Sequence, residues 1–299
     1  MTNVLSLQRI LLALGVIVFV GAAAVGATGA FFNDTETSTG NTFAAGDFDL
    51  QIDNTSYALD FNIPGYQNPI GAFVANPANS WALKDLVPGV DHFFSFEDLK
   101  PGDYSEDTIS IHVGSNDAWM CAAAQITRDA DESCTEPELA DDGTCVATET
   151  DGELDDELNF AFWRDDGDNV LEDDEVGSVF LSGPIADIGA GGQIPLADTS
   201  DTGPFGDTPI PGDETVYIGK GWCFGTFAAV PVTQDNGSDV GRSPATDVTG
   251  FTCDGSGVNN AAQTDSVQGD MQFYAVQARN NPNFLCSRDY TPTWPQVAP

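Results

Sequence analysis

Positively charged side chains are scarce in this sequence. Nine Lys and Arg residues stand against 47 Asp and Glu residues, which gives a formal net charge of -38 at pH 7. A protein that binds nucleic acid needs a basic face for the phosphates, so nucleic acid is excluded as a partner. Histidine is also rare: His92 and His112 are the whole set. They lack the H-E-x-x-H spacing of a zinc protease, and no G-x-S-x-G elbow occurs, so we expect no enzyme.

The acidity itself has two possible explanations. Acidic, low-hydrophobicity chains are often disordered, but 41% of this chain is hydrophobic and 10% is aromatic, which is enough for a core. A folded chain of this charge repels itself in dilute salt, whereas at molar salt the Debye length falls to about 3 Å. The composition therefore favours a folded protein with the surface of a halophile.

The first 30 residues have the layout of a secretory signal. Arg9 precedes an apolar run of about 16 residues, which is shorter than the ~20 residues of a spanning helix. Small residues follow, and we predict cleavage between Ala30 and Phe31. The alternative is an uncleaved N-terminal anchor. We expect a secreted, extracellular protein with no stable membrane insertion after cleavage.

Six cysteines in an exported chain predict three disulfides. Six cysteines allow 15 pairings, and sequence alone does not choose among them. Cys134 and Cys145 flank a short acidic loop and are expected to pair. Cys223 with Cys253 is the next most plausible pair, which leaves Cys121 with Cys286.

Helical periodicity is nearly absent after the signal, and several segments alternate with the period of two that half-buried strands show. The clearest lie around residues 48–52, 109–113, 160–162, 216–218 and 271–273. Turn-forming Pro-Gly and Asp-Gly pairs separate them. This pattern predicts an all-β fold, a jelly-roll-like β-sandwich. We expect one domain over residues 44–299, with loop insertions near 129–157, stapled by a disulfide, and 183–212.

Two short motifs resemble the TasA/camelysin family, whose precursors are cut by a SipW-type signal peptidase. The first is the segment 30–50, which reads AFFNDTETSTGNTFAAGDFDL, and the second is Leu-Lys-Pro-Gly-Asp at 99–103. The segment between Asp53 and His92 is longer than the family pattern, and the cysteines are not typical of it. The resemblance implies a jelly-roll subunit of an extracellular filament, either a biofilm fibre or a bundling pilus.

In such filaments the N-terminus freed by cleavage pairs with the next subunit as a donor strand. Residues 31–43 suit this role because they are rich in Thr, free of Pro and flanked by aromatic residues. One face of the extended strand would carry Phe31, Asn33, Thr35, Thr37, Thr39, Asn41 and Phe43. Copies of the chain would then be its partners, joined head to tail. The alternative is that this segment folds into its own sheet.

The segment 163–175, which reads WRDDGDNVLEDDE, resembles a calcium loop. Ca²⁺ takes six to eight hard oxygen ligands, so we predict a possible structural calcium and no other required cofactor. The candidate ligands are Asp166, Asp168, the carbonyl of Val170, Glu172 and Glu175. The Gly falls earlier than in an EF-hand loop, and a solvated acidic turn is the alternative.

Glycosylation sequons begin at Asn33, Asn54 and Asn236. A glycan on Asn33 would block a donor strand, so we expect Asn33 to be bare and Asn54 and Asn236 to be possible acceptors. Two other functions stay open besides the filament subunit. One is a monomeric cell-surface adhesin or carbohydrate-binding sandwich, and the lesser one is a camelysin-like metalloprotease.

Overall fold

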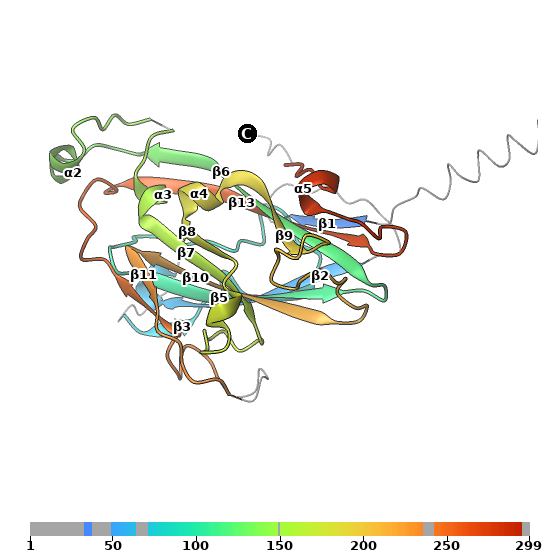
Figure 1. Cartoon of the computed structure of the whole chain (residues 1–299). Helices are drawn as coiled ribbons and strands as arrows, with labels where there is room; N and C mark the ends of the chain where they lie inside the picture. The colour runs from blue at the N-terminus through green and yellow to red at the C-terminus, as the bar shows by residue number, and fades with distance from the viewer. Residues whose placement is uncertain (1–32, 38–48, 64–70, 149, 236–241, 295–299) are drawn as a thin grey trace, which may run out of the picture.

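The computed structural model describes residues 33–37, 49–63, 71–148, 150–235 and 242–294, and its strands form two large antiparallel sheets (Figure 1). The larger sheet has the order β3-β2-β5-β10-β7-β8, with β4 also paired to β2. Its strands are β2 (Leu50–Leu59), β3 (Phe73–Ala75), β4 (Trp81–Lys84), β5 (Tyr104–Val113), β7 (Leu158–Asp165), β8 (Leu181–Pro184) and β10 (Thr215–Phe224).

The smaller sheet has the order β1-β13-β6-β9. Its strands are β1 (Asn33–Thr37), β6 (Ala118–Asp131), β9 (Ala190–Ala197) and β13 (Asp265–Gln277). A separate hairpin joins β11 (Thr226–Ala229) and β12 (Phe251–Asp254). The helices are short: α2 (Glu136–Asp141), α3 (Leu154–Glu157), α4 (Ile185–Ile188), α5 (Cys286–Asp289), η1 (Asp60–Asn62) and η2 (Val176–Ser178).

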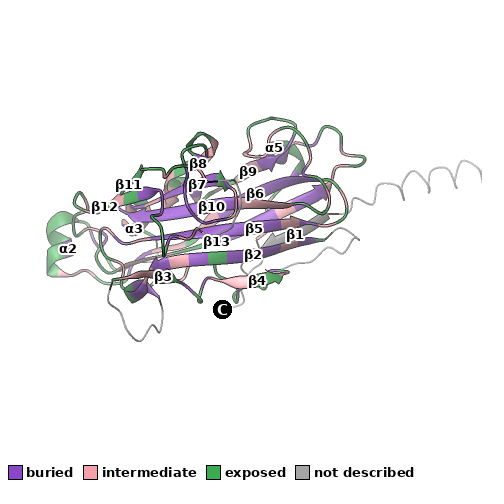
Figure 2. Ribbon diagram, turned by 90° about the horizontal axis from the view of Figure 1, so that it is seen from below, coloured by how far each residue is buried: buried purple, intermediate pink, exposed green. Residues whose placement is uncertain are grey.

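The main core lies between the two sheets, and the central strands β5, β6, β7 and β10 are buried along most of their length (Figure 2). The larger sheet contributes branched and aromatic side chains, including Ile109, Ile111 and Trp222. The facing strand β6 contributes mainly alanines, and β13 adds Phe273. Large residues on one sheet thus pack against small residues on the other, which fills the interior closely. The predicted all-β sandwich is confirmed.

The outer face of the smaller sheet is covered by the C-terminal part of the described chain. Trp119 and Cys121 of β6 pack there with Phe284, Cys286 and Tyr290. The disulfide from Cys121 to Cys286 joins β6 to α5 across 165 residues of sequence. This second core fixes the C-terminal segment to the sheet.

The other two disulfides pair Cys134 with Cys145 and Cys223 with Cys253. All three pairs are those expected from the sequence, and no cysteine is left free.

A buried ion pair lies within the main core. Lys220 of β10 binds Asp107 of β5, and neither side chain is exposed to solvent. Lys220 Nζ also donates to the backbone oxygen of Phe93, at 2.7 Å, and lies 3.9 Å from the ring centroid of Phe94. The positive charge of Lys220 is therefore neutralised by Asp107 and further stabilised by the Phe93 carbonyl and the Phe94 ring.

The predicted loop at 183–212 is wrong in part, because Ala190–Ala197 forms the edge strand β9. Glycine at 189 allows this close pairing, since a Cβ there would come within 2.6 Å of the Ile126 side chain. The predicted insertion at 129–157 begins within β6 and contains α2 and α3. Its acidic composition masked the two helical turns, one of which has a capping box formed by Thr135 and Glu138.

Candidate metal centre

Six carboxylates gather on the outer face of the larger sheet, where β7 ends and the next loop begins. They form three overlapping groups, and within each group one ligand atom per residue lies within 4.8 Å of the others: Asp165, Asp166 and Asp168; Asp166, Glu172 and Glu175; Asp168, Glu172 and Asp235. Calcium binds oxygens at about 2.3–2.6 Å, so ligands on opposite sides of one ion are about 5 Å apart. The spacing suits a single hard divalent cation or two close ones.

The loop that carries this cluster is shaped by backbone conformations that few residues adopt. Gly167 and Asn169 have φ values of 114° and 69°. The loop is then held against a distant segment, because Asp173 donates its amide to the Val232 carbonyl and Leu171 accepts from the Val232 amide. This pairing brings Asp235 beside Glu172, whose Oε1 accepts from the Asp235 amide at 3.2 Å.

Two of the six carboxylates, Asp165 and Glu175, accept hydrogen bonds with both of their oxygens. Asp165 accepts from Thr108 at 2.8 Å and from Trp163 at 3.2 Å, and Glu175 accepts from the amides of Asp166 and Glu172. These bonds set the shape of the loop. Asp166, Asp168 and Glu172 each accept with one oxygen and keep the other without a partner.

Five buried oxygens of this region have no hydrogen-bond partner in the protein. They are Asp166 Oδ1, Asp168 Oδ2, Asn169 Oδ1, Glu172 Oε2 and Gln234 Oε1. A buried oxygen without a partner costs free energy, and native structures contain few of them. A group of five acceptors with no donor is the arrangement that a bound cation would satisfy.

The pKa values of four carboxyls of the cluster are raised, and burial is the main cause of each rise. The pKa is about 6 for Asp165, about 8 for Asp168, about 7 for Glu172 and about 9 for Glu175. Repulsion from neighbouring carboxylates adds to burial at Asp168 and Glu175. Burial also raises the pKa of Glu106 well above its usual value, and Asp165 and Asp168 raise it further.

Among the described residues, Arg242 is the cation that reaches the cluster. Arg242 Nη1 lies 2.7 Å from Glu172 Oε1 and its Nε lies 3.7 Å from Asp235. A single guanidinium neutralises only part of the charge of six carboxylates. The rest must be balanced by protons or by a metal ion.

Four of the five predicted calcium ligands are brought together by the fold: Asp166, Asp168, Glu172 and Glu175. Val170 lies between them, is buried, and donates its amide to Asp168 Oδ1 at 2.9 Å. Sequence reasoning missed Asp165 and Asn169 inside the motif and Gln234 and Asp235 outside it. The last two follow the motif by about 60 residues, and no local pattern marks them.

The predicted donor strand is described only in part. Asn33, Thr35 and Thr37 lie in β1, which pairs antiparallel with β13 of the same chain, from Asn33 opposite Val276 to Thr37 opposite Gln272. This is the alternative that the sequence left open. The signal segment 1–30, the cleavage site at Ala30 and Phe31, and the donor residues Thr39 and Phe43 lie outside the described residues.

The glycosylation prediction at Asn54 is wrong for this fold. Asn54 lies in β2 with 1% of its surface exposed, and its Nδ2 donates to the Asn79 backbone oxygen at 2.5 Å. The sequon letters do not reveal that this side chain points inward. Asn236 lies outside the described residues.

The two histidines lie apart from the acidic cluster. His112 Nε2 contacts Asp53 at 2.7 Å and its Nδ1 contacts the Thr215 hydroxyl at 2.9 Å. His92 is exposed. Within the described ranges, none of the candidate metal groups contains a histidine. The geometry therefore offers no support for a zinc protease.

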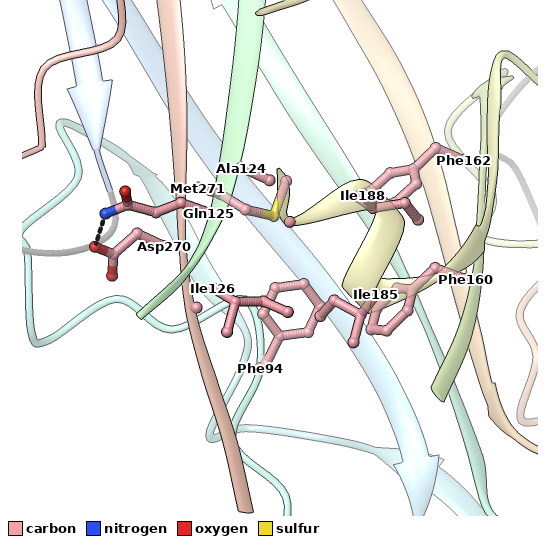
Figure 3. Close-up of a pocket in the computed structure, with 12 residues that line it drawn as sticks. Phe94, Ala124, Gln125, Ile126, Phe160, Phe162, Ile185, Ile188, Asp270 and Met271 are labelled. Carbon is pink, nitrogen blue, oxygen red and sulfur yellow. Dashed lines mark hydrogen bonds between the residues drawn. The ribbon is translucent and has the colours of Figure 1, made fainter. Parts of the chain in front are cut away.

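A small apolar cavity lies between the sheets at the α4 end (Figure 3). Phe94, Phe160, Phe162, Ile185 and Met271 point into it, and its volume is about 20 Å³. That is room for about one water molecule, whereas ligand pockets measure several hundred Å³. The cavity is a packing gap rather than a substrate site.

Comparison with known proteins identifies no relative: no family model, no curated protein and no solved structure matches this chain. Among the described residues, no helix has the length and apolar character required to span a membrane. The three disulfides indicate an oxidising environment such as the outside of a cell.

Proposed function

We propose that this protein is a secreted structural subunit of an extracellular filament, assembled by exchange of its N-terminal strand. One observation carries the proposal: β1 is an edge strand held by a single neighbour, and it begins three residues after the predicted cleavage site. The segment freed by a SipW-type signal peptidase is thus the segment that completes the smaller sheet.

The edge of β13 can pair with β1 of the same chain or with β1 of the next subunit. An exchanged strand makes the same backbone hydrogen bonds in the same register, so exchange between subunits costs little free energy. A strand given to one neighbour and received from another forms a head-to-tail contact that does not close. Such contacts build filaments.

The acidic cluster has a structural role in this proposal. Its ligands come from the end of β7, the loop after it and residues 234–235, and the loop pairs with the second segment through the backbone of Val232. A calcium ion there would fix both segments and remove the repulsion among six carboxylates. It would act as a stabiliser of the subunit rather than as a catalyst.

A second function is favoured by a specific observation. Because β1 pairs within its own chain, a complete sandwich exists without a neighbour. A monomeric surface adhesin or carbohydrate-binding module would need no exchange. A filament subunit requires β1 to leave the β13 of its own chain and pair with that of a neighbour, whereas a monomeric module keeps β1 in place.

Electron microscopy of the mature protein, purified in molar salt, tests the proposal. Protein beginning at Phe31 should form filaments in negative stain, and protein lacking residues 31–43 should remain as single particles with an unchanged circular-dichroism spectrum. A synthetic peptide of residues 31–43 should stop filament growth by occupying β13. A scrambled peptide of the same composition is the control and should have no effect. Compact particles at every concentration of the mature protein would favour the monomeric module.

A further inference from the structure

A second group of carboxylates lies where β6 ends and β13 begins. Asp131 is the last residue of β6, Asp265 is the first residue of β13, and the two stand opposite each other in the sheet register. Glu153, just before α3, joins them, and one ligand atom of each residue lies within 4.8 Å of the others. This end of β13 is the opposite end from the one that pairs with β1.

The three side chains have oxygens that the protein leaves without partners. Asp131 has 3% of its surface exposed, and its Oδ1 is buried with no hydrogen-bond partner. Glu153 Oε2 and Asp265 Oδ1 are also buried and without partners, and so is Oδ1 of the neighbouring Asp129. The three acceptors on Asp131, Glu153 and Asp265 therefore lie close together at this corner without a donor. A nine-tenths buried carboxylate with a free oxygen calls for a proton or a cation.

The remaining oxygens of the cluster set its geometry. Asp265 Oδ2 accepts from the amides of Glu153 and Leu154, at 2.7 and 3.2 Å. Gly152 lets this turn approach β6, because a Cβ there would come within 3.0 Å of the Ala130 backbone. The turn is thus held against the strand end, which places Glu153 beside Asp131 and Asp265.

Acidic residues predominate around the cluster. Burial raises the pKa of Glu153 to about 7 and of Asp265 to about 7, and neighbouring acidic residues, Asp131 among them, raise both further. The segment 129–157 contains no Lys or Arg. Arg128, one residue before it, binds Glu132 and the Ser266 hydroxyl. Oxygen-only ligands of this kind suit calcium rather than a softer transition metal.

We propose that Asp131, Glu153 and Asp265, with Asp129 beside them, bind a second calcium ion. The ion would bind the acidic segment 132–153, which carries the Cys134–Cys145 disulfide, to the paired ends of β6 and β13. Figure 1 shows α2, which this segment contains, projecting beyond the end of β6. The disulfide closes only the 11-residue loop within the segment, and the ion would fix the segment to the sheet. The site stands on different residues from the loop after β7 and does not depend on filament assembly.

Hydrogen exchange with and without calcium chloride tests the site on the full mature chain. Calcium should slow exchange of peptides covering 146–156, as well as of those covering 165–176. Glu153→Gln should abolish the calcium effect at 146–156 alone, and Glu172→Gln should abolish it at 165–176 alone. Asp151→Asn, an exposed change in the same acidic segment, is the matched control and should keep both effects. Equilibrium dialysis should then show one fewer bound ion for Glu153→Gln than for the control.

Two results would overturn the proposal. One is that calcium leaves exchange at 146–156 unchanged in the unmodified chain while it slows exchange at 165–176. The other is that Asp131→Asn raises the melting temperature in calcium-free buffer and leaves the number of bound ions unchanged, because the carboxyls would then share a proton.

Discussion

The strength with which β1 is held decides whether it can exchange, and the structure allows this strength to be worked out. β1 has five residues, each paired with one residue of β13. Five residues make about five backbone hydrogen bonds at about 1 kcal/mol each, or about 5 kcal/mol. Ordering five residues costs about 1–2 kcal/mol each, or about 5–10 kcal/mol. The hydrogen bonds thus offset the ordering cost only at the lower end of its range, so the pairing of β1 contributes little net stability.

Deletion of residues 31–43 should accordingly lower the free energy of unfolding by less than about 3 kcal/mol, since the balance of these contributions is small. Urea unfolding of the mature and shortened chains in molar salt measures the difference. Hydrogen exchange should quicken at Gln272–Val276, the residues that face β1, and should stay slow in β5 and β10. A loss of more than about 5 kcal/mol, or a shortened chain that does not fold, would refute the reasoning, because β1 would then be an integral strand.

Four further outcomes are expected. Lys220→Met alone should destabilise the fold by about 3–5 kcal/mol in urea unfolding, because it leaves the Asp107 carboxylate buried without its partner. Adding Asp107→Leu should recover most of that loss. Equal stabilities of the single and the double variant would contradict this. Replacing Cys121 and Cys286 by Ala should cost up to about 5 kcal/mol by the loop-entropy relation for 165 residues, and an unchanged melting temperature would contradict it. Calorimetric titration of calcium should release heat at micromolar concentrations, and Asp168→Asn should remove that heat; no heat up to millimolar calcium would exclude the site. In calcium-free buffer the free energy of unfolding should fall as pH rises from about 4 to about 9, because the folded chain holds protons on carboxyls with pKa values of about 8 and about 9 that the unfolded chain has already released. A flat pH profile would contradict this.

The class of fold could be predicted because its signals are local. Alternation at Ile109 and Ile111 and at Phe160 and Phe162 marks one face of a strand, and these residues are buried in the core. The edge strand β9 could not be foreseen, because its Gly-rich sequence has no such alternation. Its pairing depends on the small alanines of β6, which are distant in sequence.

The ligands that lie within one loop of the acidic site could be predicted from the sequence, whereas those from a distant segment could not. Asp166, Asp168, Glu172 and Glu175 fall at ligand-like spacing in one loop. Asp235 joins them only through the backbone pairing with Val232. The second cluster gave no motif at all, because Asp131, Glu153 and Asp265 come from three separate segments. The register of β6 with β13 places Asp131 opposite Asp265, and the amide of Glu153 donates to Asp265.

An engineered disulfide between β1 and β13 tests the central claim most directly. All six native cysteines are paired, so Thr35→Cys with Tyr274→Cys, which stand opposite each other, adds the only free thiols. Subunits with and without ¹⁵N labelling are mixed, assembled in molar salt, oxidised and analysed by mass spectrometry of the linked peptides. Exchange between subunits predicts peptides that join one labelled and one unlabelled strand, together with a ladder of covalent oligomers. Linked peptides of uniform labelling, from assembled material as from monomer, would show that β1 stays with its own chain and would contradict the account.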